Sequence, residues 1–107
     1  MTTFDDRDKA FENKFAHDEE LKFKIHARAV KLLGLWAAGL LGKNTQESEA
    51  YAIAAVEADL KQPGTQDVEK NILFDFSKAG VAIGARDIEH KLEELLAEAR
   101  NQVMHGQ

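Results

Sequence analysis

Helix-breaking residues are scarce in this chain, and their positions constrain its fold more than any other feature. The chain has one proline in 107 residues, and the strongest breakers fall at residues 42–45, 62–65 and 80–84. Proline removes a backbone donor and clashes with the preceding turn, while glycine readily takes the left-handed conformation that ends helices. Alanine, leucine, glutamate and lysine are abundant elsewhere and favour helix. The breaks predict four helices between residues 20 and 105, joined by short loops that favour antiparallel neighbours.

The breaks also predict how individual helices begin and end. Gly42 is suited to a left-handed helix end, and Thr45 is placed to cap the helix that follows. Pro63 cannot continue a helix, and Thr65 can cap the next one. The last helix begins at Gly84, which has no side chain to cap it, so we predict a frayed start there.

Apolar residues recur at helical spacing in each of the four segments, and no strand-like alternation competes with them. The expected fold is therefore all-α, a four-helix bundle over residues 20–107. Gly34 and Gly39 fall inside the first helix, where we expect a close contact with a neighbouring helix or a frayed end. The predicted core stripes are Leu21, Ile25, Leu32, Trp36 and Leu40; Ile53, Val56 and Leu60; Val68, Ile72, Phe76 and Ala79; and Ile88, Leu92, Leu95, Leu96, Ala99 and Val103.

Residues 1–19 differ from the rest of the chain. Phe4, Phe11 and Phe15 are spaced by seven and four residues, which would align them on one face of a helix, but charged residues surround them. Such a segment buries too little apolar surface to hold itself as an isolated helix in water. Composition leaves two interpretations open: the segment docks on its own bundle, or it stays mobile and folds against a partner. We therefore expect residues 1–19 to be a separate functional segment.

Charge and composition exclude several classes of protein. The net charge of -5 argues against a general nucleic-acid binder, and the absence of cysteine excludes disulfides and thiolate metal sites. The start shows no export signal, and the longest nearly apolar run, residues 32–42, is about half of what a bilayer needs. We expect a small cytoplasmic protein with no direct membrane insertion. The charge is uneven, since residues 1–20 carry a net charge of -4 and residues 21–42 a net charge of +4.

No set of residues has the spacing of a catalytic or metal site. The four histidines lack a His-x-x-x-His pattern, and neither serine has a nearby histidine partner in the sequence. The glycine-containing stretches match no phosphate-binding loop. We therefore expect no enzymatic activity, no cofactor and no metal ion.

Two functional interpretations remain. An interaction protein would use the phenylalanines of residues 1–19 on a helix that forms against its partner. A small helical module that binds adenine nucleotides would place phosphates on basic residues, with Trp36 or Tyr51 near the base. The bases are expected on several faces of the first helix, which favours the interaction protein. The candidate nucleotide-binding residues are Lys22, Lys24, Arg28, Lys31 and Trp36.

Three stretches of the sequence carry a family resemblance: FDDRDKAFENKFAHDEELKFK, KLLGLWAAGLLGK and IEHKLEELLAEAR. Together they resemble the zeta-subunit family of alphaproteobacterial F-type ATP synthases, over essentially the whole chain. The first two stretches are specific, whereas the last is a more general amphipathic helix.

The resemblance implies a regulatory subunit that inhibits ATP hydrolysis. Its N-terminal segment would insert as a helix between alpha and beta subunits at a catalytic interface, near the gamma subunit of the rotor, and block rotation in the hydrolytic direction only. Phe4, Phe11 and Phe15 would be apolar anchors. The protein would be peripheral on the membrane-bound ATP synthase, with ATP or ADP as weak further ligands. The polar rim of the inhibitory segment would comprise Asp5, Asp6, Arg7, Lys9 and Lys14.

Overall fold

The computed structural model describes the backbone of residues 3–61 and 66–106 and the side chains of residues 18–61 and 66–106. These residues form four helices and no strand, which confirms the all-α four-helix fold. The predicted break at 62–65, with the Pro63 stop and the Thr65 cap, lies outside the described residues. The helices are α1 (Thr3–Leu40), α2 (Thr45–Lys61), α3 (Gln66–Ala79) and α4 (Ala85–Met104).

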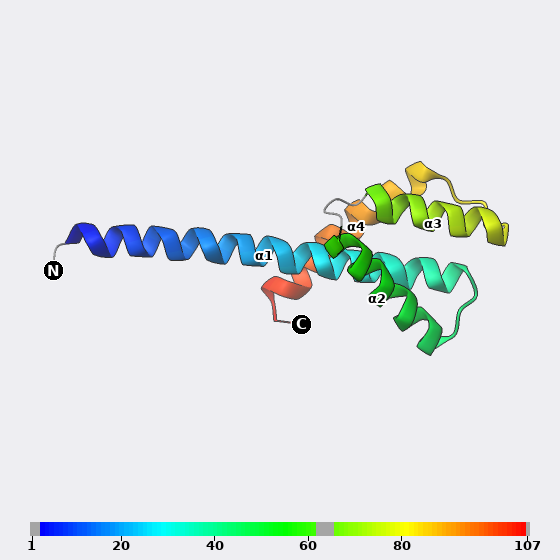
Figure 1. The fold of residues 1–107 in the computed structure, drawn as a ribbon, viewed down its shortest axis with the longest axis horizontal. Helices are drawn as coiled ribbons and strands as arrows, with labels where there is room; N and C mark the ends of the chain where they lie inside the picture. The colour runs from blue at the N-terminus through cyan, green and yellow to red at the C-terminus, as the bar shows by residue number, and fades with distance from the viewer. Residues whose placement is uncertain (1–2, 62–65, 107) are drawn as a thin grey trace.

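Helix α1 organises the molecule, because it is the longest helix and contacts the other three (Figure 1). Its 38 residues span about 57 Å at 1.5 Å per residue, and the molecule measures 65 × 24 × 22 Å. Asp18 and Leu21 of α1 share a hollow with Arg100 and Met104 at the end of α4. The N-terminal part of α1 projects beyond the other helices (Figure 1). The helix crosses residue 20 without a break, so the division there between segment and bundle stays a prediction.

Two glycines end helices in the left-handed conformation, which was predicted for Gly42. Gly42 has φ 77°, and the amides of Gly42 and Lys43 donate to the carbonyls of Gly39 and Ala38 at 3.1 and 3.0 Å. Gly80 has φ 74° and ends α3 in the same way, with the amides of Gly80 and Val81 donating to the carbonyls of Ser77 and Phe76 at 3.3 and 2.9 Å. Because glycine takes this left-handed conformation without steric cost, each glycine turns the chain out of its helix while the last carbonyls stay paired.

The helix starts differ from the predictions. The predicted Thr45 cap is wrong: the amide of Glu47 donates to Asn44 Oδ1 at 2.8 Å, and the amide of Asn44 donates to Glu47 Oε1 at 3.1 Å. This reciprocal pairing makes Asn44 the cap and Thr45 the first helical residue. The start at Gly84 has no side-chain cap, but the Gly84 amide donates to Asp87 Oδ2 at 3.1 Å. An acidic residue in the first turn therefore holds the helix start that was expected to fray.

The core matches the predicted stripes best in α3 and α4. Val68, Ile72 and Phe76 are buried as predicted, whereas Ala79 at the end of α3 is exposed. In α1 the predicted stripe only flanks the core, and Leu40 is exposed. Helix α1 is covered on two sides, by α2 and α4, so residues between the predicted positions, Leu33 among them, fill the centre. The buried core cluster is Ala29, Val30, Leu33, Ala37, Val68, Ile72, Phe76, Ile88, Leu92 and Ala99.

Helix α2 turns a different face to the core than predicted. Ile53 and Leu60 are 52% and 55% exposed, whereas Ala52 and Asp59 are buried. The reason is a close approach to α1, since a Cβ atom added to Gly34 would lie 2.7 Å from the Cα atom of Ala52. Only small residues fit at such a crossing, so the bulky residues of α2 lie beside it. The close contact predicted for Gly34 is confirmed, while Gly39 has no neighbour within 4 Å of such an atom.

Candidate functional site

The predicted partner-binding segment belongs to helix α1, whose backbone is helical from Thr3 onward. The side chains of residues 1–17 lie outside the described part of the structure, and the predicted contacts of this segment stay predictions. This applies to the apolar anchors and to the polar rim, which are Phe4, Asp5, Asp6, Arg7, Lys9, Phe11, Lys14 and Phe15.

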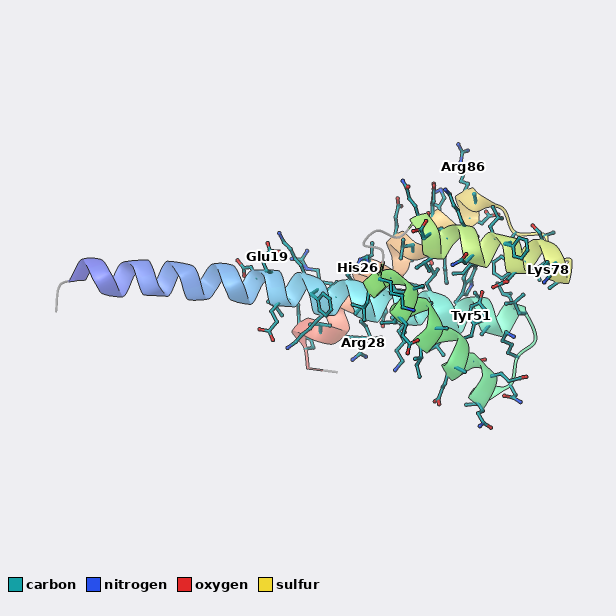
Figure 2. All side chains as sticks on the ribbon, viewed as in Figure 1. Glu19, His26, Arg28, Tyr51, Lys78 and Arg86 are labelled. Carbon is teal, nitrogen blue, oxygen red and sulfur yellow. The ribbon has the colours of Figure 1, made fainter. Side chains whose placement is uncertain are left out.

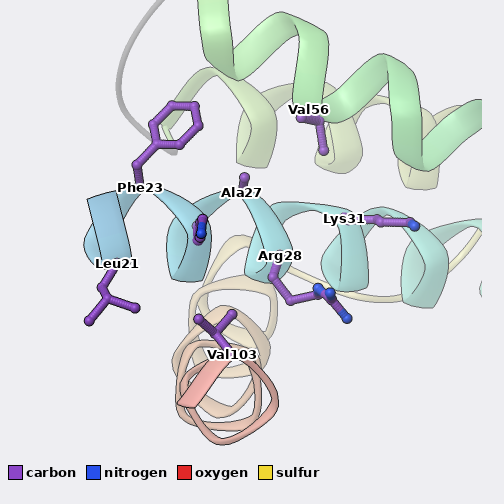
Figure 3. Close-up of a pocket in the computed structure, with 8 residues that line it drawn as sticks. Leu21, Phe23, Ala27, Arg28, Lys31, Val56 and Val103 are labelled. Atoms are coloured by element: carbon purple, nitrogen blue, oxygen red, sulfur yellow. The ribbon is translucent and has the colours of Figure 1, made fainter. Parts of the chain in front are cut away.

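Three of the four bases of residues 21–42 share one face of α1, contrary to the expectation that they would be scattered. Lys24, Arg28 and Lys31 are spaced by four and three residues, which brings them to one side of a helix. They line a single hollow of about 590 Å³ (Figure 3). Val56 of α2 points toward this hollow from one side and Val103 of α4 from the other. The remaining lining residues come from α1 and are Leu21, Phe23 and Ala27.

The bases differ in how their charges are paired. Lys24 Nζ lies 3.3 Å from Glu20 Oε1 in an exposed ion pair, and Arg28 Nη1 donates to Gln102 Oε1 at 3.1 Å. Lys22 does not line the hollow, and its Nζ atom lies 3.7 Å from Glu19 Oε1. Arg28 and Lys31 form no ion pair among the described residues, so their positive charge is available to an anionic partner.

The aromatic residues considered for a nucleotide base lie elsewhere. Trp36 packs edge-on against Phe76, with ring centroids 5.7 Å apart and planes at 81°, so it belongs to the core region. The hydroxyl of Tyr51 donates to Asp75 Oδ2 at 2.6 Å, which joins α2 to α3. Burial raises the pKa of Tyr51, as do the hydrogen bond to Asp75 and its negative charge. The hollow is therefore lined by Lys24, Arg28 and Lys31 but by neither Trp36 nor Tyr51.

Sequence reasoning missed a polar contact that joins α1 to α2 beside the hollow. His26 Nε2 lies 2.7 Å from Asp59 Oδ2, where Asp59 is only 7% exposed. The other oxygen, Oδ1, is buried and has no hydrogen-bond partner among the described residues. Asp59 follows the buried Ala52 by seven residues, two turns along one face. That spacing is the one sequence signal that could have placed Asp59 in the interface.

The described residues contain no group of three side chains able to hold a metal ion, and no helix among them is long and apolar enough to cross a membrane.

Comparison with known proteins completes the evidence on the family. One solved structure, determined by solution NMR, superposes with a TM-score of 0.70 at 37% sequence identity. It covers 81% of this chain and 99% of its own. A comparison with curated proteins found no match. The family model described as ATPase inhibitor subunit zeta matches residues 1–102. This match confirms the predicted resemblance and a regulatory rather than an enzymatic role. The chain belongs to the family of the ATPase inhibitor subunit zeta.

Proposed function

We propose that this protein inhibits ATP hydrolysis by inserting the N-terminal part of α1 at an alpha/beta catalytic interface of the ATP synthase, near the gamma subunit. The family match supports a role as inhibitor of an ATPase. The observation that carries the insertion step is the continuity of α1, which joins the N-terminal segment to the bundle without a break.

The length of α1 suits this task. Residues 3–17 account for about 22 Å of helix in the part of α1 that projects beyond the other helices (Figure 1). A projecting helix of that length can enter an interface between subunits while the bundle stays outside. Because the helix continues into the core, its direction is set by packing against α2 and α4. The bundle then holds the inserted helix in place. The rotor cannot turn in the hydrolytic direction unless it displaces this helix.

The proposed contacts divide by chemistry. Phe4, Phe11 and Phe15 are the apolar anchors, and burial of a phenylalanine side chain contributes about 1.5–3 kcal/mol. Three such anchors offset the cost of fixing the helix and its side chains in the interface, which a single one would not. Asp5, Asp6, Arg7, Lys9 and Lys14 form the polar rim that sets register. The protein acts in the cytoplasm, peripheral on the membrane-bound enzyme.

Deletion of residues 1–17 tests the insertion. Purified ATPase is titrated with the full chain and with the deletion variant while ATP hydrolysis is followed. We expect the deletion to abolish inhibition while the helical content per remaining residue, measured by circular dichroism, stays nearly unchanged. ATP synthesis by energised membrane vesicles should continue in the presence of the full chain. Full inhibition by the deletion variant would refute the insertion.

The hollow favours a second candidate, binding of an adenine nucleotide. Its support is the gathering of Lys24, Arg28 and Lys31, whose charges suit phosphates. Titration with ATP or ADP, followed by backbone amide shifts, tests it. We expect saturable shifts confined to the residues of the hollow. The absence of any localised, saturable change at millimolar nucleotide would dismiss this candidate.

A further inference from the structure

An apolar stripe of α2, half-buried at Val56 and exposed at Ile53 and Leu60, lies next to the basic hollow. Ile53, Val56 and Leu60 are spaced by three and four residues, which aligns them along one side of the helix. Val56 points into the hollow (Figure 3), while Ile53 and Leu60 leave more than half of their surface exposed. Two large aliphatic side chains exposed on one helix face, continuous with a hollow, are typical of a protein contact.

The charge of this region is one-sided. Lys24, Arg28 and Lys31 contribute three positive charges from α1, and residues 21–42 contain no acid. Among the described residues, none of the three bases forms an ion pair with α2. Glu49 and Glu57 are exposed and lie four residues before and after Ile53, so they border the apolar stripe, and the positive charge is confined to the α1 edge. The surface therefore has a basic edge on α1 and an apolar edge on α2.

We propose that this basic–apolar face, made of Lys24, Arg28 and Lys31 of α1 and Ile53, Val56 and Leu60 of α2, binds an acidic amphipathic segment of the ATP synthase. The inference rests on the proposed inhibitory function and adds a second contact to it. Charge complementarity selects the partner, because its carboxylates meet the three bases while its apolar side chains cover the α2 stripe.

The extent of the face favours a protein segment over a nucleotide. From Ile53 to Leu60 the stripe runs about 10 Å along α2, and from Lys24 to Lys31 the bases run about 10 Å along α1. A nucleotide on the bases would leave Ile53 and Leu60 in water, whereas an amphipathic helix or strand covers both edges.

The position of the face suggests how the second contact would assist insertion. It lies on the stretch of α1 that first meets α2 and α4 (Figure 2), next to the His26–Asp59 contact. A partner held there fixes the bundle, and with it the direction in which α1 leaves the bundle. Two contacts on one chain also bind in concert, since the first raises the effective concentration of the second.

Charge and polarity variants of the full chain test the proposal. One variant, K24E/K31E, reverses two bases and leaves the Arg28–Gln102 hydrogen bond in place. A second, I53E/L60E, places carboxylates on the apolar stripe at positions already exposed. The matched control, K70E/R86E, reverses two exposed bases on α3 and α4 that lie outside the face. Circular dichroism and thermal unfolding establish that each variant folds like the parent chain.

Binding to purified ATPase and inhibition of ATP hydrolysis are measured for each chain over a range of salt concentrations. We expect both face variants to raise the half-inhibiting concentration about tenfold or more while maximal inhibition is retained, and the control to stay within about twofold. Salt should weaken the parent chain more than K24E/K31E. Unchanged binding by both face variants would overturn the proposal.

The outcomes separate this inference from the proposed function. If the parent chain inhibits and the face variants inhibit equally well, the docking face is wrong and the insertion stands. If the parent chain binds the ATPase without inhibiting hydrolysis, the insertion fails, and weaker binding by the variants still supports the face. K24E/K31E could instead lose the backbone amide shifts that nucleotide induces while it still binds the ATPase normally. That result assigns the bases to an anion site and refutes the docking proposal.

Discussion

His26 of α1 and Asp59 of α2 form a short polar contact, with 2.7 Å between Nε2 and Oδ2, at the end of the bundle from which α1 projects (Figure 2). Asp59 is 7% exposed, and the side chain of His26 is 36% exposed. A buried carboxylate is tolerated when it is paired, and Asp59 Oδ1 has no other partner among the described residues. The imidazole of His26 is thus the group that compensates Asp59.

Replacement of His26 should therefore destabilise the bundle. In H26A the buried Oδ2 of Asp59 also loses its partner, and we expect the free energy of unfolding to fall by about 2 kcal/mol. Urea unfolding followed by circular dichroism measures the loss, and H90A, at an exposed histidine of α4, is the control. In the double variant H26A/D59N the uncompensated charge is absent, so stability should recover in part. Equal stability of H26A and H90A would show that the contact contributes nothing.

The crossing of α1 and α2 predicts opposite effects for two glycines of the same helix. In G34A the added Cβ atom would lie 2.7 Å from Ala52 Cα, a backbone atom that can move only if the helices separate. We expect G34A to lose about 1–3 kcal/mol of stability. In G39A nothing lies within 4 Å of the new atom, so better helix propensity should add up to about 1 kcal/mol. Thermal unfolding of both variants checks the sign of each effect.

The raised pKa of Tyr51 predicts that the folded protein loses stability at alkaline pH. Burial, followed by the hydrogen bond to Asp75 and its charge, raises the pKa of Tyr51 above its ordinary value of 10.0. The folded protein then keeps the phenol proton where the unfolded chain releases it. This contribution is fully present below pH 10 and falls as the pH rises toward the folded pKa. The free energy of unfolding, measured from about pH 8 to about pH 11, should decline more steeply for the parent chain than for Y51F.

The sequence predicted the number and type of the helices and most of their limits because glycines and apolar periodicity act locally, but α1 begins at Thr3 and not near residue 20. It placed the core correctly in α3 and α4, where one stripe faces the bundle. It failed in α2, where Ile53 and Leu60 are exposed and Ala52 and Asp59 are buried. The orientation of α2 depends on how closely its backbone approaches α1, which is a tertiary property that hydrophobic periodicity does not contain.

The candidate site shows the same limit. The sequence revealed the surplus of bases in residues 21–42, but only the packing of α2 and α4 shows that Lys24, Arg28 and Lys31 edge one hollow. Trp36, which was grouped with them, packs on Phe76 instead. The pair of His26 and Asp59 is 33 residues apart in the sequence, and no spacing rule links such distant positions.

The start of α2 offers a direct test of a corrected cap. Asn44 and Glu47 exchange two hydrogen bonds between side chain and backbone, at 2.8 and 3.1 Å, whereas Thr45 lies inside the helix. We expect N44A to lose about 1 kcal/mol of stability and T45A to change it by less than about 0.5 kcal/mol. Chemical denaturation compares the two variants, and a larger loss in T45A would restore threonine as the cap.

The proposed anchors predict a graded loss of inhibition. If Phe4, Phe11 and Phe15 are buried in the subunit interface, each alanine variant should lose about 1.5–3 kcal/mol of binding, roughly tenfold to hundredfold in affinity. The triple variant should not inhibit at concentrations at which the parent chain saturates. The matched control is F74A, which removes a phenylalanine of α3 that is 62% exposed and far from the N-terminus in sequence. Titration of ATP hydrolysis gives the affinities, and thermal unfolding shows whether the bundle is intact. If the three residues instead packed on the bundle, their replacement would lower its thermal stability. Losses of inhibition without losses of stability therefore distinguish insertion into a partner from docking on the chain itself.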